Sequence, residues 1–466
     1  MAKISATSLR EGRKAFAENR LFPHIKRKDK EMAKLNIPTK TTHVTHEGAP
    51  AKRIDAEQQL RRSLMACLLW EKTFYEEGED IANRITSAIP LVKPETVYNM
   101  AIEAREKMNL RHAPLLVARE MSRLPDHKVF VSSLLERIIQ RADELTEFLA
   151  IYWKDGRQPL SAQVKKGLAK AFTKFNAYQL AKYNRGGQVK LRDVLFLCHA
   201  KAKDEDQQII WNKLVDGTLE PPDTWEVALS AGKDKKETWE RLLSENKLGG
   251  LALLRNLRNM KEVGVNEKIL FEAFDKMETN RILPYRFIAA AKYAPQWEWK
   301  IEQAMLRSLK DYPKIEGKTI LLIDVSGSMV WNMSNNSDMN RIDAACGLAI
   351  LAREICEDIE IFTFSEENIQ IPARHGFALR DAIVGSQPHR GTYLGAAVKH
   401  IFTIPHDRLI VFTDEQSHDT VPNPKEKGYM INVASYKNGV GYGKWLHIDG
   451  FSEAIIRYIQ TLESVS

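Results

Sequence analysis

The sequence predicts two fold classes in one chain: an α-helical repeat region, followed by an α/β domain with a doubly wound, mostly parallel sheet. From Asp55 to about Leu309, apolar residues recur with the 3.6-residue period of helices, and short polar breaks separate the runs. After the linker 310–317, short apolar runs alternate with helical segments, which is typical of a parallel sheet. The two parts also differ in charge. The net charge is +8 overall, −6 from Glu316 onward and therefore +14 upstream.

Length and composition narrow the class of protein. A chain of 466 residues is expected to form two or three domains, and its 44% hydrophobic and 28% charged residues are typical of globular proteins. Neither a signal peptide nor the roughly 20 apolar residues of a membrane span can be recognised. Four scattered cysteines fit a reducing cytoplasm. We expect a basic arm over 1–45, a helical region over 46–315 and an α/β domain over 316–466.

The helical region is expected to contain roughly fourteen helices, joined by short breaks. Stacked helix pairs, as in a HEAT-like solenoid, would let each pair bury its apolar face against the next. The basic surface of such a region suggests a polyanion partner, although a solvated basic surface would need none.

Residues 160–201 hold the strongest candidate for RNA contact. Val164, Leu168, Phe172 and Phe175 form one apolar stripe, and three lysines lie about 200° round the same helix. Cations interleaved with Tyr, Gln and His suit phosphate contact and base stacking. The alternative is a solvated helix face with both tyrosines in the core. The candidates, with a second cationic pair downstream, are Lys166, Lys170, Lys174, Tyr178, Gln179, Lys182, Arg185, Lys190, Arg192, His199, Lys201, Arg255 and Arg258.

The α/β domain is expected to contain four strands, at 319–323, 360–364, 409–412 and 430–434. Helices are expected near 341–356, 377–384, 393–401 and 452–461.

Oxygen-bearing side chains gather where two of these strands end. Asp324 ends the first strand and is followed at alternate positions by Ser326 and Ser328, while Asp414 ends another and Thr392 lies in a glycine-flanked loop. The carboxyl ends of parallel strands face one crevice, so we expect these side chains to converge. Carboxylate and hydroxyl oxygens suit Mg²⁺ or another divalent cation.

These five residues resemble the metal-ion-dependent adhesion site (MIDAS) of von Willebrand factor A domains. That resemblance implies binding instead of catalysis, with the open metal position completed by an acidic side chain of a partner. The helical half resembles the TROVE module of Ro ribonucleoproteins, on the stretches Thr45-His-Glu-Gly48, Tyr178-Gln-Leu-Ala-Lys-Tyr-Asn-Arg185, Leu251-Ala-Leu-Leu-Arg-Asn-Leu-Arg258 and Arg281-Ile-Leu-Pro-Tyr-Arg-Phe287.

The resemblance to Ro proteins, of a bacterial or phage type, implies a ring of HEAT-like repeats closed by the A-type domain. It also implies binding of small non-coding, Y-like RNA on a basic surface and of single-stranded RNA ends in the ring cavity, with a role in RNA quality control or stability. We therefore expect a non-catalytic, cytoplasmic, monomeric RNA-binding protein without membrane contact. An exoribonuclease or another protein would dock at the metal site.

Two other functions stay open at this point. One is an Mg²⁺-dependent protein-interaction scaffold that binds no RNA. The other is a metal-dependent nuclease that uses Asp324 and Asp414, against which the acidic character of the α/β half argues because it would repel a phosphate backbone.

Overall fold

The computed structural model describes residues 43–52, 54–65, 78–184, 189–230, 232, 234–279, 282, 284–310, 313–333, 338–434, 436, 438–450 and 454–464. Contacts divide the chain into two units, 1–41 and 42–466, and all described residues belong to the second. The arm expected over 1–45 therefore lies almost entirely outside the described residues. No helix among those described is long and apolar enough to cross a membrane.

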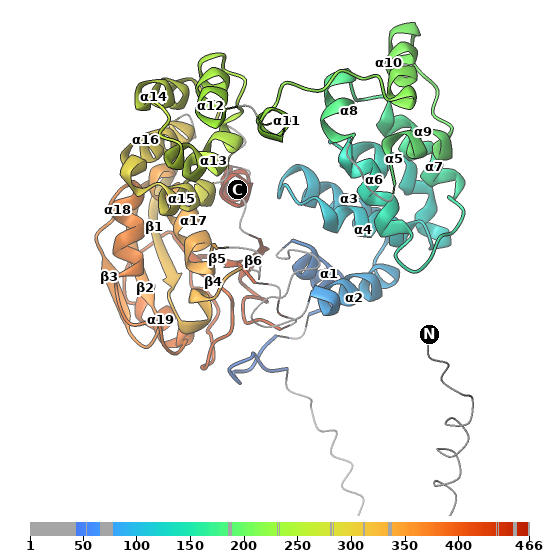
Figure 1. The fold of residues 1–466 in the computed structure, drawn as a ribbon. Coiled ribbons are helices and arrows are strands. Elements are labelled where there is room, and N and C mark those ends of the chain that lie inside the picture. The colour runs from blue at the N-terminus through green and yellow to red at the C-terminus, as the bar shows by residue number, and fades with distance from the viewer. Residues whose placement is uncertain are drawn as a thin grey trace, which may run out of the picture. The chain divides into compact units, whose positions relative to one another are not determined.

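Helices dominate the chain as far as Leu309, as the apolar period predicted (Figure 1). The described residues of this region form sixteen α-helices, where roughly fourteen were expected; α11, for example, has six residues, too few to show a period. The helices are α1 (Ala56–Met65), α2 (Gly78–Ala88), α3 (Pro94–Glu106), α4 (His112–Met121), α5 (Lys128–Ile138), α6 (Asp143–Tyr152), α7 (Ala162–Phe172), α8 (Ala177–Tyr183), α9 (Leu191–Cys198), α10 (Glu205–Asp216), α11 (Trp225–Ser230), α12 (Lys235–Ser244), α13 (Gly250–Glu262), α14 (Glu267–Lys276), α15 (Pro284–Tyr293) and α16 (Glu298–Leu309).

Helices two apart in the chain pack on each other, which is the arrangement of stacked helix pairs. Helix α5 contacts both α3 and α7, and α7 contacts α9; in the later part α12 contacts α14, and α14 contacts α16. The apolar stripe of α7 is buried as predicted, because Val164, Leu168, Phe172 and Phe175 all belong to the core. Short 3₁₀ helices are η1 (Ile89–Leu91), η2 (Pro125–His127), η3 (Pro295–Trp297) and η4 (Gly327–Val330).

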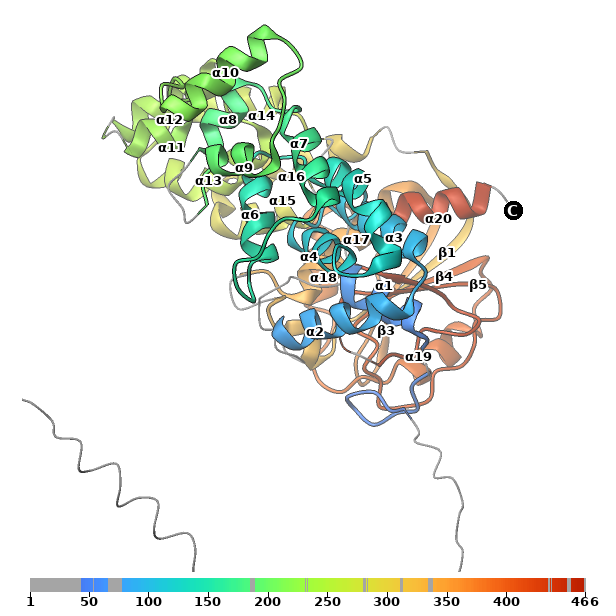
Figure 2. The same cartoon turned by 90° about the vertical axis from the view of Figure 1, so that its right-hand side faces the viewer.

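The C-terminal part contains a six-stranded sheet with helices on its faces (Figure 2). Its strand order is β3-β2-β1-β4-β5-β6, and every neighbouring pair is parallel except β2 with β3. All four predicted strands are present, and the sequence did not reveal β3 and β6. The elements are β1 (Ile315–Asp324), α17 (Arg341–Ile355), β2 (Cys356–Phe364), β3 (Asn368–Ile371), α18 (Gly376–Val384), α19 (Leu394–Ile401), β4 (Arg408–Thr413), β5 (Lys427–Asn432), β6 (Leu446–Asp449) and α20 (Ala454–Ser464).

Buried side chains divide the helical region in a way that the repeat pattern did not indicate. One core cluster runs from Leu60 to Leu214, whereas a second runs from Trp239 to Ile459 and joins helices α12 to α16 with one face of the sheet. A third cluster packs α19 on the opposite face. The last five helices of the repeat region therefore share their core with the sheet.

The N-terminal end of the helical region also contacts the sheet part. The Thr45 hydroxyl donates to the carbonyl of Ser417 at 2.8 Å, and the backbone N–H of His46 donates to Oε1 of Gln416 at 2.7 Å. These hydrogen bonds attach the segment before α1 to the loop that follows β4.

A buried group of charges, here called the charge clasp, joins α1 to β6 and the loop after β4. It consists of Arg62, Glu415, Tyr442, His447 and Asp449. Nη1 of Arg62 donates to Oε1 of Glu415 at 3.1 Å and lies 3.8 Å from Oδ1 of Asp449. Burial opposes the charge on His447, but Asp449 and Glu415 outweigh it and raise the pKa of His447 to about 9.

Further hydrogen bonds of Arg62 go to backbone carbonyls. Nε donates to the carbonyl of Tyr436 at 2.5 Å and Nη2 to that of Asn438 at 3.1 Å, and the side chain has no exposed surface. Gly439 is required here, because a Cβ atom would lie 2.1 Å from Oε2 of Glu415 and 2.8 Å from Nη1 of Arg62. The guanidinium thus holds α1 against three segments of the sheet part.

Candidate metal centre and nucleic-acid interface

The strand order reverses between β1 and β4, which is where ligand sites form in open α/β sheets. Asp324 is the last residue of β1 and Asp414 follows β4, and both side chains are fully buried. The register pairs Ile323 with Phe412, so that Thr413 lies beside Asp324, and its hydroxyl donates to Oδ2 of that carboxylate at 2.6 Å. The two predicted carboxylates therefore lie at adjacent strand ends.

Backbone hydrogen bonds bring the hydroxyl-bearing loops to the same edge. Oγ of Ser326 lies 3.3 Å from Oγ of Ser328. The N–H of Gly327 donates to the carbonyl of Arg390 at 2.8 Å, which draws the loop carrying Thr392 toward the serines. The loop after β4 also reaches Thr392, whose carbonyl accepts from the N–H of His418 at 2.8 Å.

The two carboxylates repel each other, although each accepts hydrogen bonds from the protein. Burial, and then the neighbouring Asp414, raise the pKa of Asp324 to about 7. Arg341, the first residue of α17, donates from Nη1 to Oδ2 of Asp414 at 3.3 Å and to the carbonyl of Ser328 at 3.3 Å. The guanidinium contacts Asp414, and a divalent cation would offset the repulsion between the two carboxylates that raises the pKa of Asp324.

The donor set fits a hard divalent cation, since carboxylate and hydroxyl oxygens are the ligands that Mg²⁺ prefers. In the part of the chain that the structure describes, no group of three or more His, Cys, Asp or Glu side chains is arranged so that it could hold a metal ion by itself. A metal at this edge would therefore depend on Ser326, Ser328 and Thr392 as well as on the two aspartates. Their roles as ligands stay a prediction.

Sequence reasoning missed Arg341. The feature that could have revealed this residue is a cation at the N-terminus of a predicted helix, where the helix dipole disfavours positive charge. Such a position is explained when a buried carboxylate lies opposite, as Asp414 does here.

Apolar side chains border the metal centre on its solvent side. Val330 and Trp331 follow the serine loop and are 41% and 58% exposed, and Tyr393, next to Thr392, is 41% exposed. The ring of Tyr393 stacks on His418 at a centroid distance of 5.3 Å.

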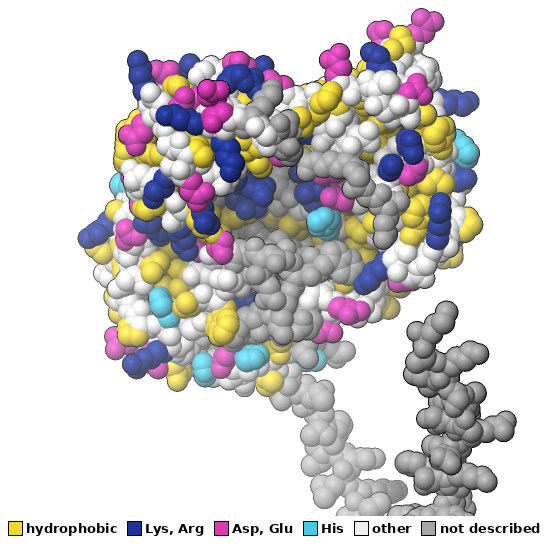
Figure 3. Space-filling view, in the orientation of Figure 1, with side chains coloured by type: hydrophobic (Ala, Val, Ile, Leu, Met, Phe, Trp, Pro, Cys, Tyr) yellow, Lys and Arg dark blue, Asp and Glu magenta, His cyan; other side chains and the backbone are white. Residues whose placement is uncertain are grey.

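Most of the predicted RNA-binding residues lie at the surface of α7, α8 and α9, and Lys and Arg side chains are interleaved with apolar ones on this face (Figure 3). Exposed residues there are Lys166, Lys170, Lys174, Tyr178, Lys190, Arg192, His199 and Lys201, whereas Gln179 and Lys182 are half-buried. Arg185 lies outside the described residues.

The three lysines expected on one helix face differ in their surroundings. Lys166 is exposed and has no hydrogen-bond or ion-pair partner among the described residues. Nζ of Lys170 lies 2.7 Å from Oε2 of Glu136. The prediction was wrong for Lys174, because α7 ends at Phe172.

The ammonium group of Lys174 instead donates to the carbonyls of Glu136 and Ile139 at the end of α5. Desolvation of that group lowers its pKa. Lys174 therefore caps a neighbouring helix, although part of its side chain is exposed.

Tyr178 is a surface residue, contrary to the alternative in which both tyrosines lie in the core. Its side chain is 48% exposed, and Nζ of Lys182 lies 5.9 Å from its ring centroid and 5.8 Å from that of Tyr183. Tyr183 is half-buried under the guanidinium of Arg141. Gln179 is occupied in a capping box at the start of α8, where its Oε1 accepts from the N–H of Asn176 at 3.0 Å.

The second cationic pair belongs to another part of the molecule. Arg255 and Arg258 are exposed on α13, whose buried residues belong to the cluster shared with the sheet. Nε of Arg258 lies 3.1 Å from Oε1 of Glu262. The structure thus does not place this pair on the core that carries α7 to α9.

Three comparisons with known proteins each found a similarity. Residues 211–320 match the TROVE domain family. Telomerase protein component 1 of Rattus norvegicus is 21% identical over 298 residues, covering 45% of this chain, and the match spans only 11% of that relative's length. The crystal structure of the Ro (RSR) protein of Deinococcus radiodurans superposes with a TM-score of 0.58 at 17% identity, over 87% of this chain and 99% of that one.

Proposed function

We propose that this chain, which matches the TROVE domain over residues 211–320 and has the fold of the Ro proteins, binds RNA without cleaving it, through the exposed cations and Tyr178 on α7 to α9. The resemblance to Ro ribonucleoproteins supports RNA as the ligand. In finer detail, we propose that this surface binds a small, structured, Y-like non-coding RNA and that another part of the helical region binds single-stranded RNA ends. The protein then acts in RNA quality control in the cytoplasm.

The observation that carries the proposal is the position of Tyr178. A tyrosine ring with 48% of its surface exposed, close to the ammonium of Lys182, gains little from burial in the free protein. It can instead stack on an unpaired base while Lys166, Lys170 and Arg192 contact phosphates. Base–aromatic stacking tolerates any sequence, which suits the binding of RNA ends.

Charge reversal tests the proposal. Lys166→Glu combined with Lys170→Glu should weaken binding of a labelled small RNA about tenfold or more, and should lower the slope of log affinity against log salt by about 1 to 2. The matched control reverses two exposed lysines of the sheet part, Lys399→Glu and Lys425→Glu, which changes the net charge equally. Equal affinity and equal salt slope in both variants would contradict the assignment of this surface.

A second function, docking of an acidic protein such as an exoribonuclease at the metal centre, is favoured by exposed Trp331 and Tyr393 beside it. Mg²⁺ should raise the melting temperature of the wild type and not of Asp324→Ala, while both keep their affinity for RNA. Labelled RNA should stay intact in the presence of Mg²⁺; products that disappear in Asp414→Ala would indicate a nuclease instead.

A further inference from the structure

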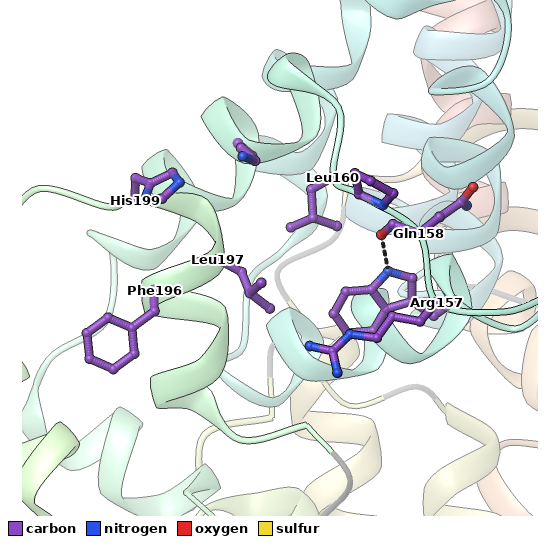
Figure 4. A pocket seen from close by; sticks show the side chains of 9 residues that line it. Arg157, Gln158, Leu160, Phe196, Leu197 and His199 are labelled. Carbon is purple, nitrogen blue, oxygen red and sulfur yellow. Dashed lines mark hydrogen bonds between the residues drawn. The ribbon is translucent and has the colours of Figure 1, made fainter.

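A cavity of about 460 Å³ lies between the loop that joins α6 to α7 and the end of α9 (Figure 4). Ligand sites in proteins have volumes of roughly 300 to 1,000 Å³, so the space is large enough for a nucleotide. Trp153, Arg157 and Lys165 contribute from the side of the loop and α7, and Phe196 and His199 from α9 and its C-cap. None of these residues except His199 was singled out from the sequence.

The wall formed by the loop is held in place before any ligand arrives. Nε1 of Trp153 donates to the carbonyl of Gln158 at 2.8 Å, and Nε2 of Gln158 donates to the carbonyl of Tyr152 at 3.3 Å. The guanidinium of Arg157 lies 5.2 Å from the Trp153 ring centroid. Figure 4 shows Leu160 and Leu197 extending into the space from the two sides. Because these groups are already ordered, a ligand would lose little of its binding free energy to ordering them.

The lining combines aromatic surface with positive charge. Phe196 is 60% exposed, which leaves one of the largest apolar side chains in water. Among the described residues, Arg157, Lys165 and His199 are the charged or titratable residues of the lining, and neither Asp nor Glu belongs to it. A planar, anionic ligand matches this combination: the ring systems offer stacking surfaces, and the cations attract a phosphate.

His199 is held in an unusual backbone conformation at the edge of the cavity. Its φ of 53° lies in the left-handed region, which glycine adopts more easily. The conformation terminates α9, where the N–H of His199 donates to the carbonyl of Phe196 at 3.3 Å. A histidine where glycine would be less strained indicates that its side chain is useful at this position.

We propose that this cavity binds one unpaired nucleobase of an RNA together with its phosphate. The base stacks on Phe196 at the α9 side of the cavity, and the phosphate is held by Arg157, Lys165 and His199. The site extends the basic surface that begins with the neighbouring residues Lys166 and Lys201, and the proposal rests on the RNA-binding function proposed above. An acidic peptide would satisfy the cations but would leave the aromatic rings without stacking partners.

A test combines one protein variant with one change in the RNA. Phe196→Ala removes a largely exposed ring, and Phe196→Tyr keeps a ring for stacking. The probe is a labelled single-stranded RNA with 2-aminopurine at one position, and its partner carries an abasic site there. Fluorescence anisotropy measures affinity, and quenching of 2-aminopurine reports stacking.

We expect Phe196→Ala to bind the 2-aminopurine strand between about fivefold and a hundredfold more weakly than wild type, and to lose the quenching. Phe196→Tyr should retain both. The abasic strand should bind wild type and Phe196→Ala equally. Trp299→Ala, which removes a ring that is 50% exposed on α16, is the matched control and should behave as wild type.

Two outcomes would overturn the proposal in different ways. If wild type binds both strands equally well and Phe196→Ala changes neither, RNA binding stands and the cavity is not a base site. If wild type binds neither strand, the proposed function itself fails, and with it the ligand assigned here. Binding of a poly-glutamate peptide that depends on Phe196, without RNA binding, would identify the cavity as a peptide site instead.

Discussion

The substitution Arg62→Met tests whether the charge clasp holds α1 to the sheet part. Methionine keeps much of the side-chain volume and removes the charge. Glu415 and Asp449, which are 0% and 3% exposed, would then keep His447 and the neutral donors Gly441 and Asn432 as partners, but would lose the charge of the guanidinium. The carbonyls of Tyr436 and Asn438 would lose their donor as well.

Breaking a buried ion pair by removing one partner costs about 3 to 5 kcal/mol, because a charge stays buried without compensation. The neighbouring Arg61 provides the control: it is 39% exposed and its Nη1 lies 2.8 Å from Oε2 of Glu103. An exposed pair of this kind contributes about 0.2 to 1 kcal/mol. The difference between the two variants should therefore be several kcal/mol, although the substitutions are one residue apart.

Hydrogen exchange followed by mass spectrometry measures the difference in local stability between the two variants at the contact between α1 and the sheet part. Amides of α1 and β6 should exchange on the order of a hundredfold to a thousandfold faster in Arg62→Met, since about 1.4 kcal/mol corresponds to a factor of ten. Amides of α14 should be unchanged. If Arg61→Met and Arg62→Met exchange at the same rate in α1 and β6, the clasp does not stabilise this contact.

Two further predictions concern charge. The pKa of His447 is raised to about 9, so its contribution, on the order of 3 kcal/mol, should be complete below about pH 6.5 and should be lost as the pH rises through 9. Thermal melting between pH 6 and 10 should show this loss in wild type and a flatter profile in His447→Gln; identical profiles would contradict the assignment. Arg341→Gln should increase the rise in melting temperature that Mg²⁺ produces, because Asp414 then has no competing guanidinium, and an unchanged rise would show that Arg341 and a metal do not share that carboxylate.

The sequence predicted the elements whose patterns are local. Strands β1 and β4 are apolar runs buried on both faces, and the alternation of strands and helices was enough to place Asp324 and Asp414 at adjacent strand ends. The edge strands were missed for a physical reason. β3 and β6 have four residues each, which is too short for a strand pattern to be recognised, and two of the four residues of β6 are the polar His447 and Asp449.

Contacts between distant residues could not be predicted in the same way. Arg62 and Glu415 are 353 positions apart, and neither has a local signal for its partner. The cavity beside α9 was missed because Trp153 and Phe196 look like ordinary core residues at helical spacing, and only the fold shows that Phe196 is exposed. Lys174 was misplaced because its sequence spacing continues the helical period two residues beyond the end of α7.

The charge clasp also sets an order of events during synthesis. Arg62 and His447 are 385 positions apart, and at about 5 to 20 residues per second the ribosome needs roughly 20 to 80 s to add the intervening chain. During that time α1 and the core around Leu60 can fold, but the guanidinium of Arg62 has no carboxylate to meet. The clasp is therefore among the last contacts that a nascent chain can complete.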